Sequence, residues 1–180
     1  MLKNKNDIRS VAFMIIIMAS FYFLWNYGAT LPLWAYIPFY AGYMVMAVTV
    51  SVMAHNHNHV NMWKNNLMNI FQDNWLTVFY GFPVFAWIPT HNTNHHTHVN
   101  TKEDYTKTWR YSEKNNLFTL LTYPSVSTKF QMGVVWDYYK ATYFTSKKKF
   151  WLNTLQFVCL VSWIAAFLFL DWRKAIAYVI

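Results

Sequence analysis

Long apolar runs without any charged residue divide the chain. No Asp, Glu, Lys or Arg lies between Arg9 and Lys64, a gap of 54 residues. A shorter gap of 21 residues separates Lys149 from Asp171. A helix that crosses a membrane needs about 20 mostly apolar residues, whereas helices of a water-soluble core keep a charged outer face. The pattern predicts an all-α integral membrane protein. The spans are expected at about 11–25, 34–54 and 150–170, with the start of a fourth at 175–180.

The residues between these runs predict how the helices connect. Gly28 and Pro32 interrupt the apolar sequence only briefly, so the first two spans should form a transmembrane hairpin with both ends on one side. The apolar segment at about 75–88 is too short to span and contains two helix breakers, which indicates an interfacial or re-entrant helix. Residues 89–149 are mostly polar. We interpret residues 1–180 as a single membrane domain.

The basic N-terminus followed by an apolar run also fits a signal peptide. The run is rich in bulky aromatic residues, and no small-residue cleavage site is evident before Gly28, so a first membrane helix is favoured. Cys159 is the only cysteine, which excludes an intrachain disulfide.

Composition and charge narrow the function classes. Hydrophobic residues make up 56% of the chain and charged residues 12%, against about 25% charged in soluble domains, which excludes a disordered chain. The net charge is +8, but the basic residues form no stripe with base-reading elements, so no nucleic-acid partner is expected. Basic residues instead flank the first span (Lys3, Lys5, Arg9) and the third (Lys147–Lys149), which predicts that this side is cytoplasmic.

All seven histidines lie between residues 55 and 98. His55 and His59 are four residues apart, so on a continued helix they share one face, and His91 and His95 repeat this spacing. His96 would lie about 100° round from His95, so the two could serve neighbouring ions. Imidazole is a common ligand of iron, zinc and copper. The candidate metal ligands are therefore His55, His59, His91, His95 and His96, with His57 and His98 as secondary candidates.

Several metal chemistries are excluded by absent residues. The chain has no His-Glu-x-x-His motif of a zinc protease. No Asp or Glu occurs at residues 74–102, so a Glu-x-x-His di-iron bundle is not encoded there. What remains is a nitrogen-rich site at the membrane surface. A histidine-rich membrane metal carrier or transporter is the alternative, although transporter sites usually lie near the bilayer midplane. We attribute most of the interleaved asparagines to the general abundance of Asn.

The order of these features resembles the integral-membrane fatty acid desaturase superfamily, which also includes alkane and lipid hydroxylases. The chain has a hairpin, an HxxxH box at His55 and His59, a broken apolar segment, and an HxxxHH box beginning at His91. The stretch WIPTHNTNHHTHVN at residues 87–100 is similar to the second box of bacterial desaturases. The resemblance implies two iron ions held by histidine boxes, with His55 and His59 in box one and His91, His95 and His96 in box two.

The resemblance also implies the reaction and its partners. We expect an oxygen-dependent desaturase that introduces a C=C bond into an acyl-lipid or acyl-thioester, with a hydroxylase on the same scaffold as the alternative. O2 is then the co-substrate, and the partners are the lipid bilayer, the acyl-chain substrate and a small electron-transfer protein, ferredoxin-like or a haem carrier. The bacterial inner membrane is favoured over the endoplasmic reticulum, with the boxes on the cytoplasmic side. A third histidine box is expected beyond residue 180, so we expect residues 1–180 alone to be inactive.

Overall fold

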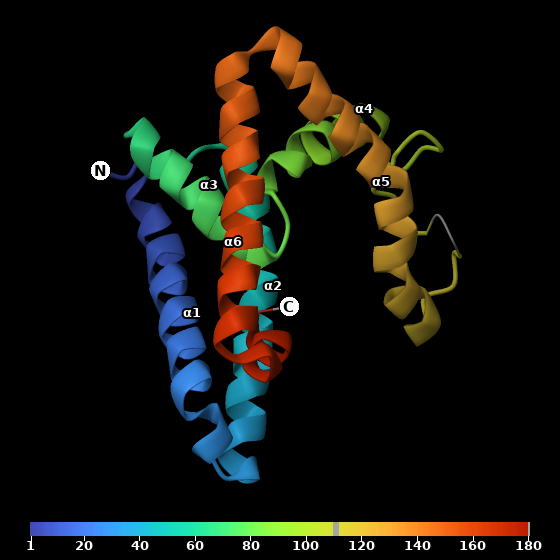
Figure 1. The fold of residues 1–180 in the computed structure, drawn as a ribbon. Helices are drawn as coiled ribbons and strands as arrows, with labels where there is room; N and C mark the ends of the chain where they lie inside the picture. Colours follow the sequence, from blue (N-terminus) through green and yellow to red (C-terminus); the bar gives the residue numbers. More distant parts are fainter. Residues whose placement is uncertain (110–111, 180) are drawn as a thin grey trace. The chain divides into compact units, whose positions relative to one another are not determined.

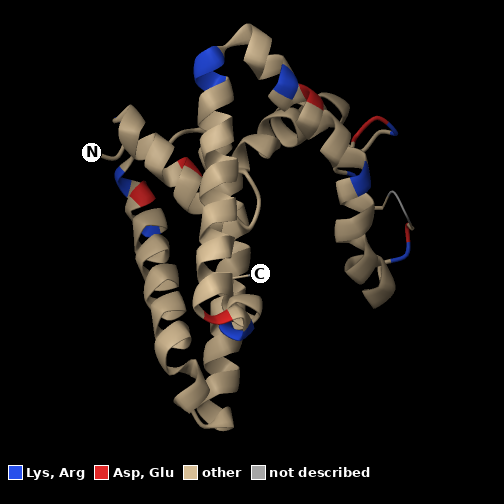
Figure 2. Ribbon diagram, viewed as in Figure 1, with Lys and Arg blue, Asp and Glu red and all other residues tan. Residues whose placement is uncertain are grey.

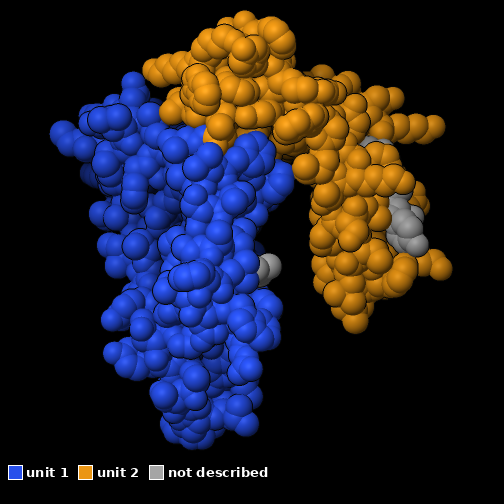
Figure 3. Space-filling model, in the orientation of Figure 1, with its two compact units in different colours: residues 1–84, 155–180 blue, residues 85–154 orange. Residues whose placement is uncertain are grey.

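The computed structural model describes residues 1–109 and 112–179, and in these ranges every regular element is a helix (Figure 1). The all-α prediction is therefore confirmed. The chain forms two compact units, drawn in different colours in Figure 3: unit 1 comprises residues 1–84 and 155–180, and unit 2 comprises residues 85–154. Each unit is described by itself below.

Within the described ranges, three helices are long and apolar enough to cross a membrane, as the sequence predicts. They are α1 (Ile8–Tyr27), α2 (Leu33–His59) and α6 (Lys147–Tyr178), whose residues from 155 onward belong to unit 1. The short helix η2 (Gly28–Thr30) joins α1 to α2, which gives the expected hairpin. Figure 2 shows α2 without a single charged residue, and the apolar side chains along it are largely exposed, as expected for contact with lipid.

Aromatic contacts fix the direction of α6 beside α1. The Phe21 ring lies 5.5 Å from Trp163, and the Trp25 ring lies 4.7 Å from Phe167, so residue numbers rise in the same direction along both helices. At the end of α1 the Lys174 ammonium donates a hydrogen bond to the carbonyl of Trp25 (2.8 Å). The two helices therefore run parallel. Helix α2, which follows α1 after the short turn, runs antiparallel to both.

A sharp bend interrupts α6 at Asp171, where the backbone is extended (φ −163°, ψ 99°). The Asp171 carboxylate accepts hydrogen bonds from the N–H groups of Arg173 and Lys174, which starts a new helical turn. The hydroxyls of Tyr40 and Tyr43 on α2 donate to the last carbonyls of this turn. The segment predicted to begin a fourth span is thus helical as far as Tyr178, and its crossing of a membrane stays a prediction.

The predicted interfacial segment at 75–88 has different boundaries in the structure. Helix α3 (Asn66–Tyr80) begins earlier, because the Asn65 side chain accepts the N–H groups of its first turn. It ends at Gly81, whose φ of +77° terminates the helix, and a separate short helix η3 (Val84–Ala86) follows. The expectation of one helix over 75–88 was wrong, because residues 66–73, taken for a polar connecting segment, form the first half of α3.

Unit 2 contains the second group of histidines and one long helix. Its elements are η4 (Ile88–His95), α4 (His96–His98), α5 (Leu117–Thr145) and the first turns of α6. The sequence analysis described 89–149 only as a polar stretch and missed α5. The many Ser, Thr and Tyr residues of α5 obscure an apolar period, although the Asn116 side chain caps its first turn at 2.9 Å from the Thr119 nitrogen.

A close approach at Gly28 provides a test of the packing in unit 1. A Cβ atom at Gly28 would lie 2.6 Å from the Tyr178 hydroxyl, so we expect Gly28→Ala to reduce the free energy of unfolding in detergent by about 1–2 kcal/mol. Adding Tyr178→Phe should restore most of the loss. Gly42→Ala, where the new Cβ meets nothing within 4 Å, is the control and should be neutral or slightly stabilising. Equal stability of the two alanine variants would contradict the docking of Tyr178 on Gly28.

Candidate metal centre

The first histidine pair lies on the last turns of α2. Because α2 continues without a break from its apolar part to His59, His55 and His59 share one face, as predicted. Their Nε2 atoms are 3.1 Å apart and their rings are nearly perpendicular, with centroids 4.7 Å apart. The two ring tips thus converge on one point beside the helix.

The distance between these ring tips suits a metal ion. Two imidazole nitrogens bound to one ion by bonds of about 2.1 Å lie about 3.0 Å apart at a right angle and about 3.4 Å apart in a tetrahedral arrangement. The separation of 3.1 Å falls within this range. The pair therefore fits two adjacent positions in the coordination shell of one ion.

The third histidine of this group, His57, has a different environment. Its side chain is buried, with 4% of the residue exposed. Its Nε2 atom lies 3.2 Å from the Asp73 carboxylate on α3 and 3.4 Å from the Asn61 amide. The expectation that His57 points away from His55 and His59 is confirmed.

The second histidine group lies on a helix that is wider than an α-helix. In η4 the backbone follows the π-helical pattern, and the His96 N–H donates to the carbonyl of His91, five residues earlier. The wider turn places His95 and His96 beside the same ring: the centroids of His91 and His95 are 5.1 Å apart, and those of His91 and His96 are 4.7 Å apart. His95 and His96 are adjacent residues whose ring centroids lie 5.8 Å apart, and the three imidazoles cluster together; that His95 and His96 serve neighbouring ions stays a prediction.

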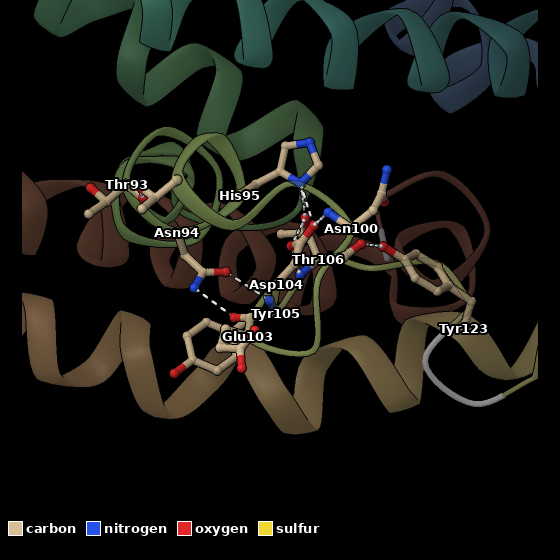
Figure 4. A network of polar contacts seen from close by, with 10 residues as sticks. Thr93, Asn94, His95, Asn100, Glu103, Asp104, Tyr105, Thr106 and Tyr123 are labelled. Carbon is tan, nitrogen blue, oxygen red and sulfur yellow. Dashed lines mark hydrogen bonds and ion pairs between the residues drawn. The ribbon is translucent and has the colours of Figure 1, made fainter.

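A buried carboxylate holds one ring of this cluster. Figure 4 shows Asp104 between His95, Asn100 and Thr106: Oδ2 lies 2.7 Å from His95 Nδ1, and the N–H groups of Asn100 and Thr106 donate to the two oxygens. Burial would raise the pKa of Asp104, but these hydrogen bonds and that of the Thr106 hydroxyl outweigh it and lower the pKa to about 2. Asp104 is therefore a carboxylate at neutral pH and can only accept hydrogen bonds.

This carboxylate determines which nitrogen of His95 is available. Because Asp104 accepts from His95, the proton of the neutral ring resides on Nδ1, and the Nε2 lone pair remains for a metal ion. The Thr106 hydroxyl donates to the other Asp104 oxygen (2.8 Å) and lies 3.0 Å from the same Nδ1. A carboxylate that fixes the tautomer and orientation of a metal-binding histidine is a common arrangement in metalloproteins.

The loop that carries Asp104 is itself held by an asparagine of the histidine box. Asn94 donates to the carbonyl of Glu103 and accepts from the N–H of Tyr105 (2.9 and 2.7 Å), and the Tyr123 hydroxyl on α5 donates to the carbonyl of Thr106. Figure 4 shows these bonds around the loop. The attribution of most asparagines to composition missed Asn94.

Two acidic residues at the histidines were not found from the sequence. Asp73 and Asp104 lie just outside residues 74–102, the stretch without acidic residues from which carboxylate ligands were excluded. Asp104 could have been recognised from its position eight residues after the His-His doublet, in a loop that must return toward the box. His98, a secondary candidate, ends α4 and is half-buried, and its carbonyl accepts from the Thr101 N–H.

The chain matches the model of a known protein family. The model of the fatty acid desaturase family matches residues 29–180, more than four fifths of the chain and all seven histidines. The comparisons with curated proteins and with solved structures gave no match.

The role of Asp104 can be tested by metal binding. We expect Asp104→Asn to weaken the affinity for Fe²⁺ or Co²⁺ about 10–100-fold, because Asn can donate to Nδ1 and favour the tautomer with its proton on Nε2. Titration of the purified full-length protein, with circular dichroism as a check of folding, measures the effect. Asp137→Asn removes a carboxylate of similar size from an exposed ion pair with Lys140 on α5 and should leave the affinity unchanged. The same affinity in both variants would contradict the role assigned to Asp104.

Proposed function

The chain belongs to the fatty acid desaturase family, and from this premise we propose that it acts as an oxygen-dependent enzyme that introduces a C=C bond into an acyl chain. The observation that carries the proposal is the coincidence of the family match with two groups of converging imidazoles. The matched residues include both groups, and the rings of each group lie close enough together to serve as metal ligands. His55 and His59 end α2, one of the helices that are long and apolar enough to cross a membrane, so an acyl chain in the bilayer would be accessible to this group.

The proposed metal ligands are His55 and His59 on α2 and His91, His95 and His96 around η4, which would together hold two iron ions. The donor set supports this assignment, because it consists of imidazoles, which suit iron. When bound, the two irons would activate O2 so that it can remove hydrogen from an unactivated C–H bond. His57 and His98 are the remaining histidines, and we propose no direct bond to iron for His57.

The other residues of the site orient these ligands. Asp104 holds the proton of His95 on Nδ1, and the π-helical turn of η4 keeps His96 beside His91. Asn94 fixes the loop of Asp104, so the carboxylate cannot withdraw from the ring without breaking two further hydrogen bonds. These contacts set the geometry before any metal or substrate arrives, which reduces the cost of assembling the site.

The electron balance of the proposed reaction requires a partner. Reduction of O2 to two waters takes four electrons, whereas removal of two hydrogens from the acyl chain supplies two electrons and two protons. The other two electrons must come from a separate donor, and the remaining protons from the solvent. We propose a small electron-transfer protein, ferredoxin-like or a haem carrier, as this donor.

The product of the reaction tests the proposed function. Membranes that contain the full-length protein, with a saturated acyl substrate, O2 and a reducing system, should yield an unsaturated product detectable by mass spectrometry. His59→Ala and His95→Ala should each abolish it, because each removes a proposed bond to iron, while Asp137→Asn should not. An alcohol in place of an alkene would indicate a hydroxylase, and metal transport without either product would contradict the proposal.

The proposed sidedness predicts a labelling pattern. With the boxes on the cytoplasmic side, single cysteines at Asn56 and Thr97 should react with an impermeant maleimide only from the cytoplasm, and a cysteine at Ala29, in the turn between α1 and α2, only from the opposite side. All three positions are exposed. The native Cys159 is first replaced by Ser. Labelling of Asn56 and Thr97 from opposite sides would exclude a shared site.

A further inference from the structure

Helix α3 carries a polar stripe on the face that packs against the protein. Asn69, Asp73 and Thr77 follow one another at intervals of four residues, so they lie on one side of the helix. Asn69 and Thr77 are buried, and the Asp73 side chain is 31% exposed. On the opposite face Leu67 and Phe71 are 74% and 54% exposed. The buried side of α3 also holds Trp75 and Leu76, so the inward polar groups lie in a partly apolar contact and need hydrogen-bond partners there.

Each member of the stripe binds a different segment of unit 1. Asn69 accepts from the N–H of Trp63 and donates to its carbonyl, both at 3.0 Å, and so fixes the chain that leaves the first histidine box. Thr77 donates to the Gln156 side chain on α6 and accepts from the N–H of Val84, both at 3.2 Å. Asp73 lies between them and contacts His57, in the middle of the box. The stripe thus connects α3 to the end of α2 and to α6.

The contact with Asp73 determines what His57 can do. Asp73 is an acceptor, so the His57 Nε2 atom carries a proton and donates to it. The Asn61 amide atom 3.4 Å from the same Nε2 is then better assigned as its oxygen than as its nitrogen. Nε2 is therefore occupied. The other ring nitrogen, Nδ1, is buried and has no hydrogen-bond partner among the described residues.

We propose that Asp73 is a positioning residue, which holds the last turns of α2 through His57 so that His55 and His59 converge on the metal site. This inference rests on the proposed function of these two histidines as ligands. Ring tips lie about 6 Å from a helix axis, so a rotation of α2 by about 10° would move them by about 1 Å. Displacements of this size are enough to impair a metal or catalytic site. A hydrogen bond on the opposite face of the same turns prevents this rotation.

The alternative role for His57 is that of an additional metal ligand. The two roles make different predictions for glutamine, whose side-chain amide reaches about as far as Nε2 of histidine and can donate to Asp73, but which is a poor ligand for iron. A positioning role predicts that Gln replaces His57 well and that Leu does not. A ligand role predicts that both substitutions remove the same metal–nitrogen bond.

The experiment compares His57→Gln, His57→Leu, Asp73→Ala and the double variant His57→Leu/Asp73→Ala in the purified full-length protein, with Asn66→Ala on exposed α3 surface as control. Fe²⁺ and Co²⁺ titrations give stoichiometry and affinity, and Co²⁺ absorption reports the number of nitrogen donors. We expect unchanged stoichiometry in all variants. The metal affinity should fall about 10–100-fold for His57→Leu and for Asp73→Ala. The double variant should show no greater loss than either single variant. For His57→Gln and the control the affinity should fall less than about threefold.

Two results would overturn the proposal. One is an Asp73→Ala variant that binds metal with wild-type affinity. The other is the loss of one bound metal ion in both His57→Gln and His57→Leu, whether or not Asp73 is present. If a variant does not fold, the remaining single variant and His57→Gln still separate the two roles. Failure of the proposed function is distinguishable, because it would appear as absent metal binding and absent product in the wild-type protein. The contact itself can then be checked in metal-free protein, where the unfolding free energies of the two single and the double variant should be non-additive.

Discussion

An imidazole can bind a metal ion only through a nitrogen that no other group occupies, and this constraint explains how the two carboxylates at the histidines differ. Asp104 takes the proton on Nδ1 of His95, at the base of the ring, and leaves the ring tip with a lone pair. Asp73 contacts Nε2, the ring tip of His57, and leaves only a buried nitrogen. The same kind of hydrogen bond therefore prepares one histidine as a ligand and makes another a structural support.

Helix geometry determines which histidines can act together. On α2 the regular turn brings His55 and His59 to one face and turns His57 to the other. In η4 the π-helical turn gathers three rings that an α-helix would spread further round its axis. π-helical turns are rare and are frequently found at functional sites. The hydrogen bonds of Asn94 and Asp104 offset the free-energy cost of the π-helical backbone at this site.

The sequence predicted the parts of the fold that depend on apolar content alone. The spans at 11–25, 34–54 and 150–170 all lie within observed helices, because a stretch of about 20 residues without charge has few other stable solutions. Helix α3 was misplaced and α5 was missed, because their polar residues resemble those of loops when their partners are unknown. The ligand histidines were identifiable from spacing, whereas Asp73 and Asp104 were not, since their roles depend on contacts across 16 and 9 positions of the chain.

The two faces of α3 link the membrane to the site. Leu67 and Phe71 are exposed and can contact the lipid boundary, while Asn69, Asp73 and Thr77 contact the protein beside the buried Trp75 and Leu76. The lipid then stabilises one face of α3, and the hydrogen bonds of the other face hold the end of α2 in place against α3. In a detergent that does not cover Leu67 and Phe71, α3 would lose this support, and the convergence of His55 and His59 would depend on the hydrogen bonds of Asn69, Asp73 and Thr77 alone. Metal affinity at the first box should therefore be more sensitive to the lipid environment than the geometry of the second box, whose supporting carboxylate lies within its own loop.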